Sequence, residues 1–424
     1  MKFEKLCVLG LGYIGLPTAS TFASHGLKVV GVDVNKRIVE SLGHGELHIY
    51  EPGLRTLVQA SLRSGNLVVK QEPEEADAFI ISVPTPFKEE KKADLSFVIS
   101  ATEAIVPHLR QGNLVVLEST SPPRTTVDVV APILERSGLK AGEDFLLAYS
   151  PERVLPGQIL RELIENARVI GGIDLVSAEA GRDLYAIFVR GEIILTDATT
   201  AEMVKLMENT YRDVNIGIAN EFSRLAERFG VDVWEAVQIA NLHPRVSILG
   251  PGIGVGGHCI SVDPWFFVEA APDITPLIAT ARRVNDAQPH FVVSLIRKAM
   301  GEGLHGRRLA VLGLAYKPNV DDMRESPAVD VARLLAEAGA KVKAFDPFKP
   351  ELCIPGLDVV STLEEAVADA EALVLTVGHK QLCEIDPVQM AGMTPARLAL
   401  DMIHGWPQEI WRQAGFSVQG LGIR

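Results

Sequence analysis

The sequence predicts an α/β protein with two Rossmann-like domains, one N-terminal and one C-terminal, joined by a long central helix and a helical dimerisation region. Three observations predict this architecture. The chain opens with a strand, a glycine-rich turn, a helix and a strand; a continuous helical pattern occupies residues 199–229; and a segment near Arg307 repeats the opening pattern. The expected domains are 1–198, 199–303 and 304–424, because 424 residues exceed what one core usually supports.

The composition is that of a globular protein. Hydrophobic residues make up 47% of the chain and charged residues 22%. No apolar run reaches the roughly 18 residues of a membrane span, and the N-terminus lacks the features of a signal peptide, so we expect a cytoplasmic location. The formal net charge of −13 argues against nucleic acid or an anionic membrane as a partner. It leaves open an anionic small ligand held by local basic groups.

The opening stretch, residues 5–33, has the pattern of a dinucleotide-binding unit. An apolar strand runs into the sequence GLGYIG, a helix pattern follows, and a second strand ends at Asp33. In this turn Gly10 permits the tight bend, Gly12 the close approach of backbone to a pyrophosphate, and Gly15 the packing of helix on strand. The helix N-terminus favours the phosphates. Because Asp33 accepts from a ribose 2′-hydroxyl and repels a 2′-phosphate, the pattern predicts NAD as the cofactor and disfavours NADP.

Three further apolar strands, 79–83, 114–118 and 146–148, extend an open parallel sheet. Ligands of such sheets bind outside the carboxyl ends of the strands. We therefore expect functional residues in the segments that follow these strands. Those segments are VPTP (83–86), ESTS (118–121) and YSPER (149–153).

The central helical pattern has expected ends at both sides. Thr199 or Thr200 is the expected N-cap, and Gly230 is the expected stop. A long helix between two α/β regions, with apolar residues on its sides, suits a subunit interface.

Polar residues recur along one face of this helix. Lys205, Asn209 and Arg212 stand at positions i, i+4 and i+7, and Asn220 continues the same stripe. The spacing is typical of a binding face, but it is equally typical of an ordinary solvated face. Both interpretations stay open at this point.

The C-terminal repeat consists of a strand, a GLxY turn, a helix, a glycine and a strand that ends at Asp346. A second correspondence, EEADAFIISVPTP (74–86) with DAEALVLTVGHK (369–380), supports a duplicated fold. The copy has lost the dinucleotide turn, because Ala315 replaces the second glycine and a charged insertion, residues 317–326, follows. Basic side chains at this strand end predict a second, different anionic ligand.

The stretch GPGIGVGGHCISVDPW, residues 250–265, surrounds one cysteine with glycines. The four cysteines of the chain form no CxxC pair, which argues against a disulfide framework or a metal site, and Cys7 is expected in the core. Cys259 differs, because it precedes an expected helix start with Asp263 as N-cap and Pro264 as first residue. Positive potential at such a place favours the thiolate, which is the nucleophilic form. The glycines are interpreted as backbone brought close to a ligand.

These features narrow the chemistry. Nicotinamide enzymes that use a cysteine typically oxidise aldehydes through a thiohemiacetal and a thioester. The residues therefore predict an NAD-dependent dehydrogenase that makes an acid from a phosphorylated or nucleotide-linked substrate. Two alternatives stay open: a one-step dehydrogenase of the 6-phosphogluconate type, which needs no cysteine, and a nucleotide-sensing protein without turnover.

Seven motifs follow one another along nearly the whole chain: GLGYIGLP, SVPTPF, ESTSPP, SPERVLPG, AEMVKLMENTYRDVNIGIANE, GPGIGVGGHCISVDPW and LGLAYKPNVDDMRESPA. Together they resemble the UDP-glucose/GDP-mannose dehydrogenase family. The forms GGHCISVDPWF, PERVLPG and NLHPRVSILGPG are most similar to the members that act on UDP-N-acetyl-D-mannosamine, with UDP-N-acetylglucosamine and UDP-glucose as alternative substrates. One residue departs from the pattern, because Arg124 stands where relatives commonly carry a glycine.

The resemblance implies that a homodimer oxidises the C6 hydroxyl of a UDP-sugar to a carboxylate in two steps, with two NAD⁺ and water. It implies no metal ion. The implied catalytic residues are Cys259 for the covalent intermediates, Lys205 and Asn209 for the oxyanion at C6, Asp263 and Thr120 for the water, and Glu152 for thioester hydrolysis. The implied cofactor-binding residues are Gly10, Gly12, Tyr13, Ile14, Gly15, Asp33, Pro84, Thr85, Thr120 and Arg324. The implied substrate-binding residues are Glu152, Arg153, Lys205, Asn209, Arg212, Gly252, Gly256, Gly257, His258, Lys317 and Arg245. Of these, Arg245 is implied to contact the substrate bound to the partner subunit.

Overall fold

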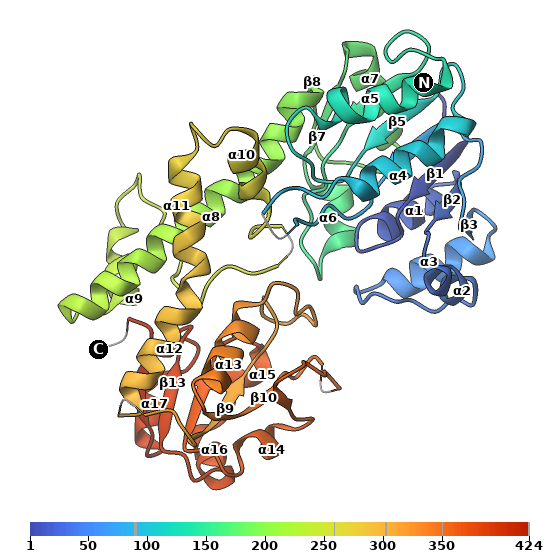
Figure 1. The fold of residues 1–424 in the computed structure, drawn as a ribbon. Helices are drawn as coiled ribbons and strands as arrows, with labels where there is room; N and C mark the ends of the chain where they lie inside the picture. The colour runs from blue at the N-terminus through green and yellow to red at the C-terminus, as the bar shows by residue number, and fades with distance from the viewer. Residues whose placement is uncertain (89–90, 258, 302, 350, 423–424) are drawn as a thin grey trace. The chain divides into compact units, whose positions relative to one another are not determined.

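The structure is a computed structural model that describes residues 1–88, 91–257, 259–301, 303–349 and 351–422 (Figure 1). The chain forms two compact units, of which the first comprises Met1–Glu208 with Trp265–Pro272 and the second Asn209–Pro264 with Asp273–Arg424. Within the described ranges, no helix is both long enough and apolar enough to cross a lipid bilayer.

The first unit is built on a sheet of strand order β3-β2-β1-β4-β5-β6-β7-β8. Neighbouring strands are parallel, except that β6 and β7 are antiparallel. The order reverses between β1 and β4, which places the ligand-binding crevice of such sheets beside the glycine-rich turn. The strands are β1 (Lys5–Leu9), β2 (Lys28–Val32), β3 (Leu67–Lys70), β4 (Ala78–Ile81), β5 (Leu114–Leu117), β6 (Leu146–Tyr149), β7 (Arg168–Gly172) and β8 (Ile193–Asp197).

Both faces of this sheet are buried, as its apolar strands predict. Along β1, Leu6 and Val8 belong to one core cluster, and Cys7 and Leu9 belong to the other. Burial raises the pKa of the Cys7 thiol to about 12, and the prediction of a core cysteine is confirmed. The helical segments of this unit are α1 (Gly15–Ser24), α2 (Lys36–Gly43), α3 (Leu54–Arg63), α4 (Ser96–Ile105), η1 (Val106–His108), η2 (Thr126–Val130), α5 (Ala131–Leu134), η3 (Glu135–Ser137), α6 (Ile159–Glu165) and α7 (Leu175–Tyr185).

The second unit contains a parallel sheet of order β11-β10-β9-β12-β13-β14. With β9 matched to β1, this order repeats that of β3-β2-β1-β4-β5-β6, so the predicted duplication of a Rossmann-like fold is confirmed. Alternate residues of its strands again fall into two core clusters. The strands are β9 (Arg308–Leu312), β10 (Lys341–Phe345), β11 (Asp358–Val359), β12 (Ala372–Leu375), β13 (Leu398–Asp401) and β14 (Ser417–Gly420).

The predicted central helix is α8 (Ala198–Phe229). It begins one residue earlier than predicted, so the assignment of Thr199 or Thr200 as N-cap was wrong and both lie in its first turn. The carboxylate of Asp197 supplies the cap, because it accepts the backbone N–H of Thr200 at 2.9 Å. Gly230 ends the helix as predicted, with φ of 67°.

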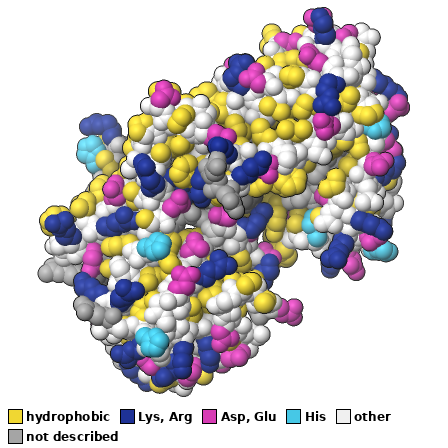
Figure 2. Space-filling view, in the orientation of Figure 1, with side chains coloured by type: hydrophobic (Ala, Val, Ile, Leu, Met, Phe, Trp, Pro, Cys, Tyr) yellow, Lys and Arg dark blue, Asp and Glu magenta, His cyan; other side chains and the backbone are white. Residues whose placement is uncertain are grey.

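Helix α10 (Asp263–Ala270) also starts one residue earlier than predicted, so Asp263 is its first residue. The predicted helix itself is present. The remaining helices are α9 (Val233–Ala240), α11 (Pro276–Asp286), α12 (Gln288–Ala299), α13 (Pro327–Glu337), α14 (Leu363–Val367), α15 (Lys380–Cys383), α16 (Pro387–Met393) and α17 (Gln408–Gln413). On the face drawn in Figure 2, Lys and Arg side chains are interspersed with Asp and Glu.

Candidate active site

The glycines of the dinucleotide turn divide into two kinds. Gly10 has φ of 92°, and a Cβ there would overlap the carbonyl oxygen of Ser82 at the end of β4. A Cβ on Gly15 would overlap the carbonyl of Gly10, so helix and turn pack backbone to backbone. A Cβ on Gly12 would meet no protein atom within 4 Å, so this glycine leaves an open side where a ligand can approach.

Asp33, at the carboxyl end of β2, is held in place by backbone N–H groups of the glycine-rich turn and of the residues after β2. One carboxylate oxygen accepts the backbone N–H of Leu11 at 3.1 Å and the other accepts that of Asn35 at 2.9 Å. The side chain remains half-buried, and so do Tyr13 and Ile14 in the turn. The carboxylate is therefore fixed in place and still reachable by a ligand.

The ends of β4 and β5 are joined by side-chain hydrogen bonds. The hydroxyl of Ser119 accepts the N–H of Val83 at 2.9 Å and donates to its carbonyl at 2.7 Å. The hydroxyl of Thr85 donates to the carbonyl of Thr120 at 2.6 Å. The structure thus brings together two predicted cofactor residues, with Pro84 exposed beside them.

Arg124, the departure from the family pattern, has φ of 73°, a conformation that glycine adopts without strain. The Arg124 guanidinium pairs with Asp128 at 2.7 Å on the surface. Its backbone N–H and that of Thr126 donate to the buried carboxylate of Glu202, whose pKa burial raises to about 7.

Three predicted site residues of the first unit lie together. The Lys205 ammonium is buried and donates to the backbone carbonyl of Glu152 at 2.8 Å, which rules out a purely solvated face for this position. Arg153 donates to Glu208 at 3.1 Å and to the carbonyl of Ala167 at 3.1 Å. In this structure its guanidinium is therefore engaged by protein groups.

Sequence reasoning missed two buried residues beside Glu152, Arg168 and Tyr185, whose partners Glu118 and Ser150 lie in the predicted strand-end segments. Arg168, at the start of β7, donates to Glu152, to the hydroxyl of Ser150 at 3.0 Å and to Glu118 at 3.5 Å. The hydroxyl of Tyr185 donates to Glu118 at 2.9 Å. A charged residue at the start of an otherwise apolar strand, RVIGG, was the available signal.

In the second unit, Cys259 lies on the turn that leads into α10. Its carbonyl accepts the N–H of Val262 at 3.0 Å and that of Asp263 at 2.8 Å. The amide of Asn209 donates to the buried Asp263 carboxylate at 2.6 Å. These hydrogen bonds connect three predicted catalytic residues, Cys259, Asp263 and Asn209. The predicted substrate residue His258 lies outside the described residues.

The glycines before Cys259 face the loop that follows β9. A Cβ on Gly256 would overlap the carbonyl of Glu325 and lie 2.6 Å from Pro327. Gly257 has φ of 83°, and a Cβ there would lie 2.7 Å from Tyr316. These two glycines are explained by close packing against the Glu325 carbonyl and the side chains of Tyr316 and Pro327.

Gly252 differs, because a Cβ on it would meet nothing within 4 Å. Its backbone is held on both sides by amide side chains. Asn220 of α8 accepts the Gly252 N–H at 2.9 Å, and Gln288 of α12 donates to its carbonyl at 3.0 Å. Asn220 also donates to Asn285 at 2.9 Å, so the polar stripe of α8 continues inside the protein at this position.

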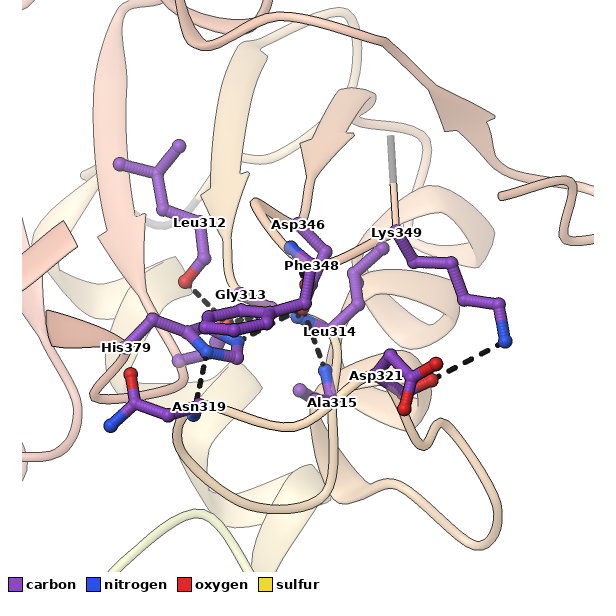
Figure 3. Close-up of polar contacts among 12 residues, drawn as sticks. Leu312, Gly313, Leu314, Ala315, Asn319, Asp321, Asp346, Phe348, Lys349 and His379 are labelled. Carbon is purple, nitrogen blue, oxygen red and sulfur yellow. Dashed lines mark hydrogen bonds and ion pairs between the residues drawn. The ribbon is translucent and has the colours of Figure 1, made fainter. Parts of the chain in front are cut away.

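The second sheet uses its equivalent of Asp33 differently (Figure 3). Asp346 is fully buried and accepts the backbone N–H groups of Leu314 at 2.8 Å and Ala315 at 3.0 Å. His379 donates to the same carboxylate at 3.0 Å, and its other ring nitrogen accepts the N–H of Asn319 at 2.9 Å. Burial opposes ionisation, but these donors outweigh it and hold the pKa of Asp346 below its usual value. The Asp346 carboxylate is therefore bonded to protein groups of the loop and does not take the ribose-binding role predicted for Asp33.

The remaining predicted cationic residues differ in exposure. Arg212 and Arg245 are exposed and Lys317 is half-buried. The Arg324 guanidinium pairs with Asp322 at 2.6 Å in this structure.

Three family models match the chain in order. They describe the NAD binding domain, the central domain and the UDP binding domain of the UDP-glucose/GDP-mannose dehydrogenase family, over residues 4–189, 199–287 and 310–406. The chain belongs to this family. It is an NAD-dependent nucleotide-sugar dehydrogenase, and the predicted cofactor and enzyme class are confirmed.

Relatives match it over nearly their full length. The UDP-N-acetyl-D-mannosamine dehydrogenase of Methanococcus maripaludis is 47% identical, over 99% of this chain and 97% of its own. The NDP-N-acetyl-D-galactosaminuronic acid dehydrogenase of Ralstonia solanacearum is 47% identical, over 91% and 93%. The structure of UDP-D-ManNAc dehydrogenase from Pyrococcus horikoshii superposes with a TM-score of 0.91 at 39% identity, over 99% of each chain.

The packing of the glycine loop predicts different costs for two substitutions. Gly256→Ala should lower the free energy of unfolding by about 1–3 kcal/mol, because its methyl group overlaps the 325–327 backbone. Gly252→Ala is the matched control and should leave stability within about 0.5 kcal/mol, because its methyl group meets no protein atom. Urea denaturation measures the free energy of unfolding of both variants. Equal values for the two variants would contradict the close packing of Gly256.

The position of Asp33 predicts cofactor preference. The enzyme should reduce NAD⁺ at least about tenfold more efficiently than NADP⁺, since a 2′-phosphate would meet a fixed carboxylate. Asp33→Asn should lower the ratio of kcat/KM for NAD⁺ to kcat/KM for NADP⁺. Comparison of kcat/KM for both cofactors checks this, and similar values in the unmodified enzyme would refute the role of Asp33.

Proposed function

We propose that this enzyme oxidises the C6 hydroxyl of a UDP-N-acetylhexosamine, most closely UDP-N-acetyl-D-mannosamine, to the carboxylate through covalent intermediates on Cys259. The observation that carries the proposal is the arrangement around this residue. The thiol lies at the turn before α10, whose first residue Asp263 is hydrogen-bonded to Asn209 of α8. We place the reaction in the cytoplasm.

The chemistry balances for a four-electron oxidation. NAD⁺, when bound, accepts one hydride in each of the two oxidations. The Cys259 thiolate adds to the aldehyde carbon to form a thiohemiacetal, and oxidation of that carbon gives a thioester. Water then forms the new C–O bond, the C–S bond breaks and the thiolate leaves. One CH₂OH group, two NAD⁺ and one water thus give one carboxylate, two NADH and three protons.

The other site residues receive roles that their chemistry supports. Lys205 and Asn209, one turn apart on α8, would stabilise the oxyanion at C6, because an ammonium and an amide N–H donate to developing negative charge. Asp263 and Thr120 would hold the water, and the carboxylate of Glu152 would take its proton during hydrolysis.

We assign the ligands to the domains expected from the sequence. Residues 1–198 would bind NAD through Gly10, Gly12, Gly15 and Asp33, whose open side and fixed carboxylate suit a dinucleotide. Residues 199–303 would carry the catalytic loop. Residues 304–424 would bind the UDP group with Lys317.

We also propose a homodimer formed through α8. An isolated helix face with a row of exposed apolar side chains is typical of an interface. Arg245, which is exposed on the segment after α9, would reach the partner's site. The apolar residues of this row are Tyr211, Ile218, Phe222, Leu225 and Phe229, which are 39% to 72% exposed.

Covalent catalysis predicts the behaviour of Cys259→Ala. This variant should form no acid, with kcat reduced by at least about 10³-fold, because the thioester cannot form. NAD⁺ binding, measured by calorimetry, should be unchanged. Full turnover by the variant would exclude the covalent mechanism.

A panel of sugar nucleotides tests the substrate and the reaction type together. UDP-N-acetylmannosamine should be oxidised at least about tenfold more efficiently than UDP-N-acetylglucosamine, UDP-N-acetylgalactosamine or UDP-glucose, with two NADH formed per sugar. One NADH per sugar would favour the one-step alternative, and binding without NADH would favour a sensor. A preference for another sugar in the panel would refute the assignment of mannosamine.

A further inference from the structure

A single buried arginine connects the ends of β5, β6 and β7 in the first unit. Arg168 is 4% exposed, and its guanidinium lies between the carboxylates of Glu118 and Glu152. It also donates to Ser150 and lies over the ring of Tyr185, with 4.1 Å between the guanidinium carbon and the ring centroid. None of these partners except Glu152 is among the residues that the family motifs assign to the site.

Burial of a cation at a strand end is costly unless it is paired. Arg168 receives that pairing from both carboxylates, and the planar guanidinium fixes the direction of each contact. The following residues of β7 are apolar or glycine, and in other proteins replacement of a buried ion pair by apolar residues is often neutral or stabilising. The paired guanidinium therefore fixes the directions of the side chains that it contacts.

The side chain that is oriented is Glu152. One of its carboxylate oxygens accepts from Arg168, and the other accepts the backbone N–H of Arg153 at 2.7 Å. The backbone carbonyl of Glu152 accepts from the ammonium of Lys205 at 2.8 Å. A shift of Arg168 would therefore move both the proposed base and the anchor of the proposed oxyanion donor.

The second carboxylate of the cluster is that of Glu118, whose side chain is buried beside Arg168. Burial raises the pKa of Glu118 to about 7, although the positive charge of Arg168 opposes this rise. Near neutral pH, Glu118 therefore carries a proton in part of the molecules. The hydroxyl of Tyr185 donates to Glu118 at 2.9 Å and holds it in the cluster.

We propose that Arg168 is a positioning residue for thioester hydrolysis, which holds the Glu152 carboxylate in the orientation that accepts a proton from the attacking water. Glu118 and Tyr185 hold Arg168 in turn. In the step concerned, the water oxygen bonds to the C6 carbonyl carbon, its proton passes to Glu152, the C–S bond breaks and the thiolate of Cys259 leaves. The inference rests on the proposed function, because it needs the acyl-enzyme and the role of Glu152.

Arg168→Lys tests the proposal, because lysine keeps the charge and loses the planar two-sided contact. Steady-state kcat should fall at least about tenfold, as expected when a general base is misplaced. The pre-steady-state burst of two NADH per active site should persist, KM should not rise, and intact-protein mass spectrometry should find the sugar acyl group on Cys259. An equal loss of burst and steady-state rates without an adduct would overturn the proposal.

Two further variants keep the test independent of folding. Glu118→Gln keeps an oxygen acceptor for Tyr185 and Arg168 and should leave steady-state kcat near neutral pH within about threefold; a loss beyond about tenfold would overturn the proposal. Cys7→Ser places a hydroxyl in the core of the same sheet and should lower stability while leaving the ratio of burst to steady-state rate unchanged.

The NADH yield of the unmodified enzyme distinguishes failure of the proposed function from failure of this inference. One NADH per sugar there would refute the proposed function, whereas two NADH with no adduct in Arg168→Lys would refute only this inference.

Discussion

Close approach of backbone to backbone at glycine is the constraint on which both sheets depend. At the end of β1, Gly10 lies against the carbonyl of Ser82, and at the end of β9, Gly313 has φ of 96° with a would-be Cβ 2.5 Å from Val377. Each glycine lets the loop after the first strand cross the end of the neighbouring strand, where the sheet order reverses. Each glycine keeps this crossing free of a side chain, and the crossing is where ligands of such sheets bind.

From this common geometry the two copies differ in how they use the acid at the end of the second strand. Asp33 is half-buried and accepts two backbone N–H groups, so it remains available to a ligand. Asp346 is fully buried and accepts from His379 as well as from the backbone. The second copy thus uses its acid to hold the insertion that carries Lys317, which explains how a dinucleotide scaffold can present basic groups to a different anion.

Several charged side chains of the first unit are buried. Lys205, Arg168, Glu118 and Glu202 are each less than 10% exposed, and each has a specific hydrogen-bond partner. Such groups are costly in a core unless they are paired, and here each is paired. Their concentration beside the ends of β5 and β6 agrees with the position of ligand sites in parallel sheets.

The sequence by itself determined the two Rossmann-like repeats, the bounds of α8 to within one residue, the NAD-binding turn and the family. These are local patterns, in which strand and helix periodicity and glycine spacing are read within one short segment. Only the tertiary structure decided that Arg168 meets Glu118 and Glu152, that Gly256 lies on the 325–327 backbone, and that Arg124 adopts a left-handed conformation. Those contacts join residues far apart in the chain or depend on backbone angles, and a single sequence records neither the pairing nor the cost of burying a charge that pairing offsets.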